Sequence, residues 1–238
     1  MDQVQSLRRG EAPPRPSRPL VVEVAGPAGT GKTTLIEAVA VRDPLMEIGI
    51  HLSRIEMFLS HGANIVRFLP TFARRAGFSW FTDEEARAMA YIDGWHRSLG
   101  RMPRRGTLML DHGPVFRLAF LAQFGSSITK TPEFERWWTA SLAKWASALD
   151  VVVQLDAPDD VLIHRIRARE RKHPVKQGSY AEARRFLARY RGGFDRVVAD
   201  WSTGSAPLVL RYRTDGCSPV ELASELTRAL AAACARDG

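Results

Sequence analysis

The sequence predicts a three-layer α/β domain in which helices cover both faces of a parallel sheet. Three short apolar runs, at 20–25, 106–111 and 151–156, are typical of buried strands. Helical patterns separate these runs, and strands that alternate with helices form parallel sheets through right-handed crossovers. The 238 residues are enough for one such domain.

The remaining elements follow from periodicity and capping. Residues 1–18 carry four arginines and three prolines without apolar periodicity, which predicts a disordered basic tail before a domain at 19–238. A second strand is expected within 45–56. Two helices are expected within 57–100, one of them starting at Thr82 with acids in its first turn. The later elements are expected as helices at 134–149, 158–170, 180–200 and 220–230 and a last strand at 208–210.

Composition places the chain among ordinary globular proteins. A net charge of +8 favours polyanionic partners, either nucleic acid or phosphorylated small molecules, although interleaved acids equally suit a solvated basic surface. The sequence contains neither an apolar run of membrane-spanning length nor a secretory signal, so no membrane association is expected. Cys217 and Cys234 form no metal-binding or disulfide pattern, which suits a reducing cytoplasm.

A glycine-rich turn joins the first expected strand to the first expected helix. Residues 26–33 match G-x-x-x-x-G-K-[ST] at every fixed position, in the strand–turn–helix context that this motif requires. Its backbone N–H groups and the helix N-terminus are expected to hold phosphates, while Lys32 reaches the β- and γ-phosphates and Thr33 binds Mg²⁺. The residues expected to bind the nucleotide are Gly26, Ala28, Gly29, Thr30, Gly31, Lys32, Thr33 and Thr34.

An acidic residue ends the strand at 106–111. The carboxyl ends of parallel strands border the crevice where ligands bind, so Asp111 is expected there as a metal ligand together with Thr33. Alternatively, Asp111 can cap the next helix, or it can accept a proton from a molecule that receives the terminal phosphate. Asp156 ends another strand, and because a helix follows closely, its expected role is to cap that helix.

A dense basic segment follows the strand at 151–156. Like charges four residues apart on a helix repel each other, and a bound triphosphate would relieve that repulsion. We therefore expect a lid at about 168–179 that closes over the phosphates, with a solvated basic surface as the alternative. If the helix continues, Arg165, Arg169 and Lys172 share one face. The basic residues are Arg165, Arg167, Arg169, Arg171, Lys172, His173 and Lys176.

The loop at 214–218 separates the last strand from the last helix. It is expected beside the glycine-rich turn, where it could contact the base of a nucleotide. The N-K-x-D motif with which GTPases read guanine does not occur in the sequence, which favours ATP.

With these motifs, the sequence resembles the thymidylate-kinase-like branch of the P-loop nucleoside and nucleotide kinases. The resemblance runs through 20–35, 108–125 and 150–230, and only the glycine-rich turn is highly specific. It implies a five-stranded sheet in the order 2-3-1-4-5, ATP with Mg²⁺, and closure of the basic lid. It also implies catalytic roles for Lys32 and Asp111, and for Arg165 and Arg169, which match the lid spacing of the family.

The acceptor side departs from this family. His112 stands where the family has an arginine that helps to hold the acceptor's phosphate, and the family's Arg-Glu-Pro-Gly-Gly stretch is absent. Arg54 and Glu56, expected at the end of the second strand, Asp93 and His112 are therefore the predicted acceptor residues. Glu56 or Asp111 can act as the base, and the weaker charge of His112 favours a neutral hydroxyl acceptor.

Two hypotheses of function stay open. The first is a kinase that transfers the γ-phosphate of ATP to a nucleoside, a nucleotide or another small hydroxyl compound. The second is a non-kinase NTPase that acts with a protein or a nucleic acid, which the positive charge and the basic tail motivate. The sequence does not decide between a monomer and a homodimer.

Overall fold

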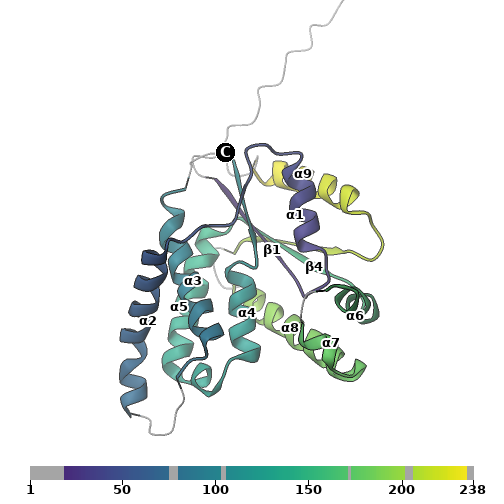
Figure 1. Ribbon diagram of the computed structural model, residues 1–238. Coiled ribbons are helices and arrows are strands. Elements are labelled where there is room, and N and C mark those ends of the chain that lie inside the picture. The colour runs from purple at the N-terminus through teal and green to yellow at the C-terminus, as the bar shows by residue number, and fades with distance from the viewer. Residues whose placement is uncertain (1–18, 75–79, 103–105, 171–172, 202–205, 235–238) are drawn as a thin grey trace, which may run out of the picture.

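Five parallel strands form one sheet in the order β2-β3-β1-β4-β5, as the family resemblance implied (Figure 1). The computed structural model describes residues 19–74, 80–102, 106–170, 173–201 and 206–234, and the predicted tail at 1–18 lies outside them. The strands are β1 (Leu20–Ala25), β2 (Glu47–Ile48), β3 (Thr107–Asp111), β4 (Val151–Asp156) and β5 (Leu208–Arg213).

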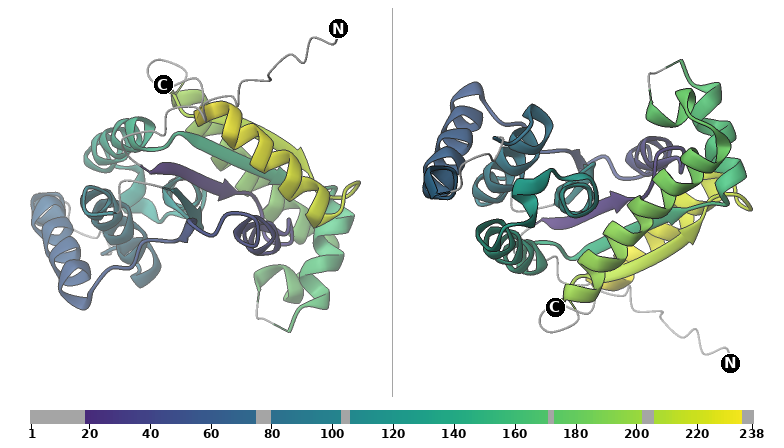
Figure 2. Two further views of the ribbon diagram at one scale, coloured as in Figure 1. Left: turned by 90° about the horizontal axis from the view of Figure 1, so that it is seen from above. Right: turned by 90° about the horizontal axis from the view of Figure 1, so that it is seen from below.

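Helices pack on both faces of this sheet (Figure 2). One face is covered by α1 and α9, and the other by α3, α4, α5 and α8. The helices are α1 (Lys32–Ala40), α2 (Arg54–Arg74), α3 (Asp83–Leu99), α4 (Pro114–Phe124), α5 (Pro132–Ala148), α6 (Asp159–Ala168), α7 (Pro174–Gln177), α8 (Tyr180–Trp201) and α9 (Pro219–Cys234), with a short 3-10 helix at Ser127–Lys130. None of the described helices is long and apolar enough to cross a membrane.

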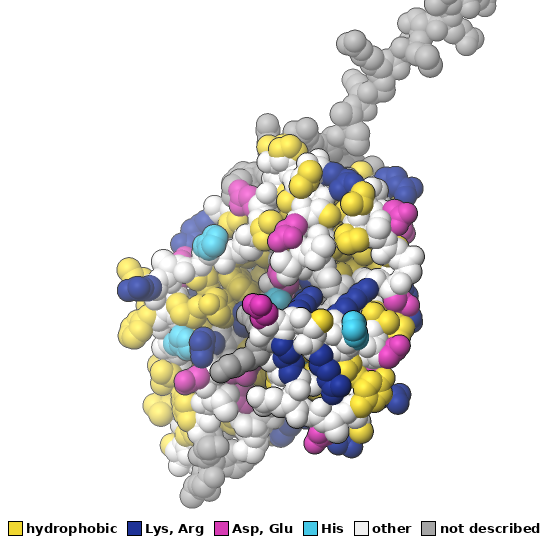
Figure 3. Space-filling model, turned by 45° about the vertical axis from the view of Figure 1, so that its right-hand side comes forward, with side chains coloured by type: hydrophobic (Ala, Val, Ile, Leu, Met, Phe, Trp, Pro, Cys, Tyr) yellow, Lys and Arg dark blue, Asp and Glu magenta, His cyan; other side chains and the backbone are white. Residues whose placement is uncertain are grey.

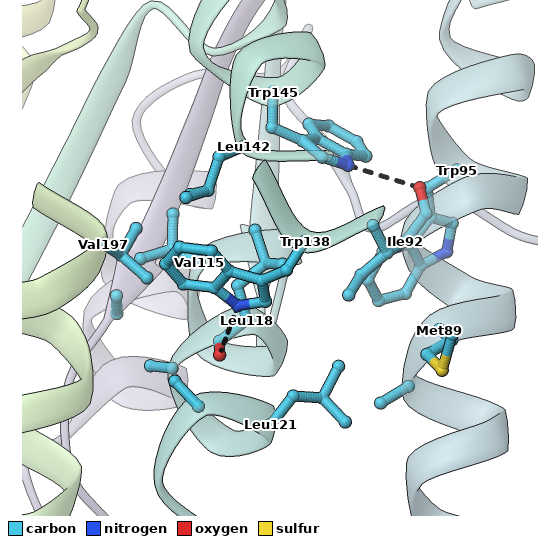
Figure 4. Close-up of a cluster of buried hydrophobic side chains, with 14 of the residues drawn as sticks. Met89, Ile92, Trp95, Val115, Leu118, Leu121, Trp138, Leu142, Trp145 and Val197 are labelled. Atoms are coloured by element: carbon cyan, nitrogen blue, oxygen red, sulfur yellow. Dashed lines mark hydrogen bonds between the residues drawn. The ribbon is translucent and has the colours of Figure 1, made fainter. Parts of the chain in front are cut away.

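Side chains of β1 point alternately to the two faces of the sheet and contribute to the hydrophobic core on each face. Val22 and Val24 pack beneath α1 and α9, whereas Val21 packs beneath the helices of the opposite face. In that larger core, Trp138 and Trp145 of α5 are buried and donate hydrogen bonds from their indole nitrogens to the carbonyl oxygens of Leu118 and Ile92 (Figure 4). The aromatic pattern at 134–149 is therefore that of a helix packed into the core, as its periodicity predicts.

The predicted start of a helix at Thr82 is confirmed. The hydroxyl of Thr82 accepts a hydrogen bond from the N–H of Glu85, whose carboxylate accepts one from the N–H of Thr82. This capping box satisfies two backbone groups that a helix N-terminus otherwise leaves unpaired.

The second strand lies within the expected range 45–56, but it ends before Arg54 and Glu56, which the prediction placed at its end. Strand β2 is limited to Glu47–Ile48, and Gly49 follows it with φ 74°, a left-handed conformation that ends the strand. Arg54 and Glu56 belong instead to the first turn of α2. Ser53 and Glu56 exchange side-chain hydrogen bonds with each other's backbone N–H, so a second capping box starts the helix there.

Candidate active site

The glycine-rich turn lies between the carboxyl end of β1 and the N-terminus of α1. A Cβ atom at Gly26 would lie 2.3 Å from the carbonyl oxygen of Leu155 in the neighbouring strand, so a larger residue cannot fit. Gly31, with φ 83°, makes the left-handed turn that begins α1. The turn therefore has the conformation in which successive N–H groups can surround an anion.

Lys32 lies within this turn and is buried. Its ammonium donates hydrogen bonds to the carbonyl oxygens of Gly26 at 2.8 Å and Pro27 at 3.0 Å. Burial lowers the pKa of Lys32 to about 8, Asp111 opposes this shift, and Arg169 adds to it. The ammonium of Lys32 is therefore fixed next to the glycine-rich turn, whose motif predicts phosphate binding.

The structure brings Thr33 and Asp111 together. The Thr33 hydroxyl donates to Oδ2 of Asp111 at 3.0 Å, although the two residues are 78 positions apart in the sequence. Burial opposes ionisation of Asp111, but hydrogen bonding to His112, the charges of His112 and Lys32, and the Thr33 hydroxyl together lower its pKa. Asp111 is therefore a carboxylate that contacts the first turn of α1, directly after the glycine-rich turn.

His112 follows Asp111 in a strained conformation. Its φ of 54° is uncommon for a residue with a side chain and costs roughly 1–2 kcal/mol. The imidazole Nδ1 lies 2.8 Å from Oδ1 of Asp111, and the ring meets Phe116 edge-on with 4.4 Å between centroids. Phe116 in turn stacks on Tyr190 at 5.4 Å. An aromatic wall therefore borders the carboxyl end of β3.

The two predicted lid arginines lie on the other side of the turn. Arg165 donates to the carbonyl oxygens of Gly29 and Thr214 and to the Thr214 hydroxyl, which places the loop at 214–218 beside the turn, as predicted. The positive charge of Arg169 contributes to the lowered pKa of Lys32. In Figure 3, Lys and Arg side chains gather beside a hollow near the centre of the molecule.

Helix α6 lies within the helix expected at 158–170, but it does not continue through the basic segment, so the condition for a shared face of Arg165, Arg169 and Lys172 is not met. Helix α6 ends at Ala168, and Arg169 follows it in an extended conformation. The Lys176 ammonium binds the carbonyl oxygen of Arg169, which stabilises this break. Arg165 and Arg169 therefore do not share a helical face, and Arg171 and Lys172 lie outside the described residues.

Asp156 does not cap α6, contrary to the prediction. The cap position is Pro158, which has no side-chain hydrogen bond. Arg191 of α8 instead holds both carboxylate oxygens of Asp156, at 2.9 and 3.0 Å, and contacts Asp159 at 2.6 Å. This bidentate pair anchors α8 to the end of β4, a role that the sequence did not indicate.

The structure does not gather the four predicted acceptor residues. Only His112 adjoins Asp111. Glu56 caps α2 and pairs with Arg101, in the segment that leads to the amino end of β3, and Arg54 is exposed at the start of α2. Asp93 of α3 accepts hydrogen bonds from Arg67 and Trp137. Asp93 also lines a cavity of about 120 Å³ between α2, α3 and α5.

Two residues near the carboxyl end of β3 escaped sequence reasoning. Arg117 of α4 stacks its guanidinium on Tyr91 and Trp95 of α3, at 4.4 and 4.9 Å from the ring centroids. Among the described residues its Nε has no hydrogen-bond partner. Trp95 donates to the carbonyl oxygen of Ile50 and is buried, so it is a core residue that also supports this cation.

Glu23 is the second missed residue. It is fully buried in β1, and its carboxyl group accepts hydrogen bonds from the N–H groups of Val115 and Phe116 at 2.8 and 2.9 Å. Burial raises the pKa of Glu23 to about 8, against the opposing effect of these hydrogen bonds and of Arg117. A single acid within an otherwise apolar strand was the available signal for it.

The fold is shared with solved nucleoside kinases. Three structures of a deoxyadenosine kinase from M. mycoides match, with bound dATP (TM-score 0.52, 11% identity), with products dCMP and a flexible dCDP (0.50, 10%), and with dCTP (0.51, 12%). They cover 88–90% of this chain and 99–100% of their own. No family model matches the sequence, and no curated protein does.

This likeness defines the class of fold. The chain has the P-loop nucleoside kinase fold, with the five-stranded parallel sheet in the order 2-3-1-4-5 and helices around it. At 10–12% identity the likeness carries no information about the substrate of this chain.

The shifted pKa of Glu23 predicts a pH dependence of stability. Between its usual pKa of 4.5 and the folded value of about 8, the folded chain retains a proton that the unfolded chain releases. Stability from this group is therefore complete below pH 4.5 and is lost as pH rises towards 8. Relative to Glu23→Gln, the wild type should lose up to ~1.4 kcal/mol of unfolding free energy per pH unit in that window.

Urea denaturation of both proteins across this pH window measures the difference, which cancels the contributions of the histidines that the two chains share. Glu37→Gln, on the exposed side of α1, serves as the control and should run parallel to the wild type. Parallel curves for Glu23→Gln as well would show that Glu23 is ionised in the folded chain.

Proposed function

We propose that this chain is an ATP- and Mg²⁺-dependent kinase that phosphorylates a hydroxyl group of a small, nucleoside-like acceptor. The observation that carries the proposal is the contact between Thr33 of the phosphate-binding turn and the carboxylate of Asp111, beside Lys32. Phosphoryl transfer requires positioning and charge neutralisation more than covalent chemistry, and these groups supply both.

The phosphate-binding turn performs the first task. Its inward N–H groups and the α1 N-terminus bind the phosphates of ATP, and Lys32 contributes the positive charge nearest to them. Because Lys32 is already held by the carbonyls of Gly26 and Pro27, little side-chain entropy is lost when it acts. Its environment is therefore organised in advance of phosphate binding.

The donor set at Thr33 and Asp111 suits magnesium. Mg²⁺ prefers oxygen ligands and takes only one or two from the protein, with water and phosphate oxygens completing the octahedron. A hydroxyl and a carboxylate 3.0 Å apart meet that requirement. The described residues contain no cluster of three or more His, Cys, Asp or Glu that would form an all-protein metal site. Bound Mg²⁺ would neutralise charge on the transferring group.

Arg165 and Arg169 are the proposed source of positive charge on the lid side. Arg165 is anchored to the turn and to Thr214, whereas Arg169 follows the end of α6 and is exposed. Arg169 is therefore free to approach the γ-phosphate, while Arg165 mainly fixes the loops that surround the nucleotide.

The acceptor is proposed to bind at the carboxyl end of β3. The rings of Phe116 and Tyr190 provide flat apolar surface next to His112, and such surface suits a planar base. The half-buried Arg117, whose buried Nε has no hydrogen-bond partner among the described residues, favours a carbonyl or other acceptor oxygen on that ligand. Asp111 adjoins this surface and can orient the attacking hydroxyl or accept its proton.

The function is tested by ADP formation with a panel of nucleosides, nucleotides and small hydroxyl compounds. An acceptor-dependent rate with a phosphorylated product is expected, and Lys32→Ala should lower that rate by 10²-fold or more. Arg228→Ala, which removes an exposed cation from α9, should leave it unchanged.

The folded state of Lys32→Ala is checked by circular dichroism. A variant that retains more than about a tenth of the wild-type rate would contradict transfer at this loop. ADP formation that only a nucleic acid or a protein stimulates would support a non-kinase NTPase instead.

Asp111→Asn separates metal binding from a structural role. Asparagine keeps the shape and one acceptor oxygen but removes the charge, so the Mg²⁺ concentration for half-maximal rate should rise by about tenfold or more. A Mg²⁺ titration at saturating ATP measures this shift, with Asp195→Asn on the exposed side of α8 as the control. Unchanged titrations would remove Asp111 from the site.

A further inference from the structure

The solvent-facing side of helix α2 is apolar, which is unusual for a monomeric protein. Ser60, Asn64 and Thr71 are among its buried residues, whereas six large apolar side chains face outward. Phe58 is 76% exposed and Val66 is 72% exposed. We call these six residues the α2 stripe: Ile55, Phe58, Leu59, Ile65, Val66 and Leu69. A helix of a soluble monomer normally has the opposite arrangement.

The position of α2 leaves this stripe accessible. The helix packs mainly on α3 and stands at the outer edge of the molecule, as the views in Figures 1 and 2 agree. In area, the stripe exposes on the order of 600 Å² of apolar residues, at the upper end for a monomer and close to the ~800 Å² that each partner contributes to a standard interface.

The stripe is symmetric about Gly62. Each residue of the α2 stripe on one side of Gly62 has a counterpart in the stripe at the same number of positions on the other side. The pairs are Ile55 with Leu69, Phe58 with Val66, and Leu59 with Ile65. In an interface with two-fold symmetry, residue i contacts j and j contacts i, so a sequence with this symmetry matches itself when two helices run antiparallel.

Gly62 also suits the position on the two-fold axis. A Cβ atom added there would meet nothing within 4 Å, so the fold of the single chain does not require a glycine at this point. Glycine in the middle of a helix costs roughly 0.5–1 kcal/mol relative to alanine. A small residue at the crossing point permits two helix backbones to approach closely, which offsets that cost.

We propose that a second copy of this chain covers the α2 stripe, with the two α2 helices antiparallel and crossing at Gly62. The antiparallel arrangement also keeps the like charges at the helix ends apart. Arg54 faces position 70 of the partner helix rather than the partner's Arg54, and the helix dipoles oppose each other. The interface lies on the far side of α3 from the candidate active site, so this proposal does not depend on the proposed kinase activity.

The oligomeric state of the full chain is the first test. Sedimentation equilibrium should show a dimer, and Phe58→Glu should raise its dissociation constant by on the order of 100-fold or more, since the symmetry places the charge in the interface twice. Val41→Glu introduces the same charge at an equally exposed apolar residue after α1 and should leave the dimer intact. A wild-type monomer up to about 100 μM would overturn the proposal.

Gly62→Leu distinguishes a self-matching interface from a merely adhesive surface. Leucine raises the helix propensity and adds apolar area, so a surface that recognises some other apolar partner would bind more strongly. At a two-fold crossing the same side chain separates the helices, and the dimer should dissociate while circular dichroism shows an intact fold. A dimer that persists in Gly62→Leu would place the crossing elsewhere and overturn the proposal.

Disulfide formation tests the antiparallel register, in a Cys217→Ser background because Cys217 is exposed. Gly62→Cys should form a covalent dimer under mild oxidation, whereas Ile55→Cys alone should not. The double variant Ile55→Cys/Leu69→Cys should form one, since the two positions lie about 21 Å apart within one helix and only meet between copies. Efficient coupling of Ile55→Cys alone would indicate parallel helices and overturn the register.

Discussion

The contact between Thr33 and Asp111 depends on one constraint, the pairing of β1 directly with β3. The register sets Val24 opposite Asp111, so the glycine-rich turn that follows β1 and the acid that ends β3 emerge at the same edge of the sheet. Because the carboxyl ends of parallel strands meet at one edge of the sheet, this pairing is enough to bring the Thr33 hydroxyl and the Asp111 carboxylate to within 3.0 Å of each other. The same edge of the sheet carries Lys32, Asp111 with its lowered pKa, and His112 in its strained conformation.

Two polar contacts attach helices to the same edge of the sheet, one on each flank. Glu23 joins the middle of β1 to the N-terminus of α4, which carries the aromatic wall next to His112. On the other flank, Arg191 joins α8 to the end of β4 and the start of α6, from which the lid arginines extend. Separate carboxyl groups, one buried in β1 and one partly exposed at the end of β4, thus attach α4 and α8 to the sheet.

Sequence reasoning predicted the features that depend on local pattern. The buried strands, the turn at 26–33, the Thr82 cap and the strand order were confirmed, because each rests on apolar periodicity, on a short motif or on a family resemblance that the fold bears out. It was wrong where a contact from a distant segment decides the outcome. Asp156, expected to cap α6, instead pairs with Arg191, 35 positions away. The nucleotide-side and metal-site residues were predictions from a motif and remain predictions of function, although Thr33 and Asp111 do meet.

The predicted acceptor side was the part of the chain that the sequence described least well. The reason is that α3 makes contacts on two sides, with Arg117 on one and with α2 on the other. Helix α3 carries Tyr91 and Trp95, which hold Arg117 towards the sheet, and it supports α2 on its other side. Helix α2 buries the polar residues Ser60 and Asn64 and exposes Phe58. Because this is the reverse of the usual amphipathic pattern, the sequence of one chain does not predict which face of the helix is buried. If the outward face is an interface between copies, residues 57–100 were shaped by self-association as well as by the acceptor. Glu56 and Asp93, predicted as acceptor residues from their expected positions, are a helix cap and an interhelical contact.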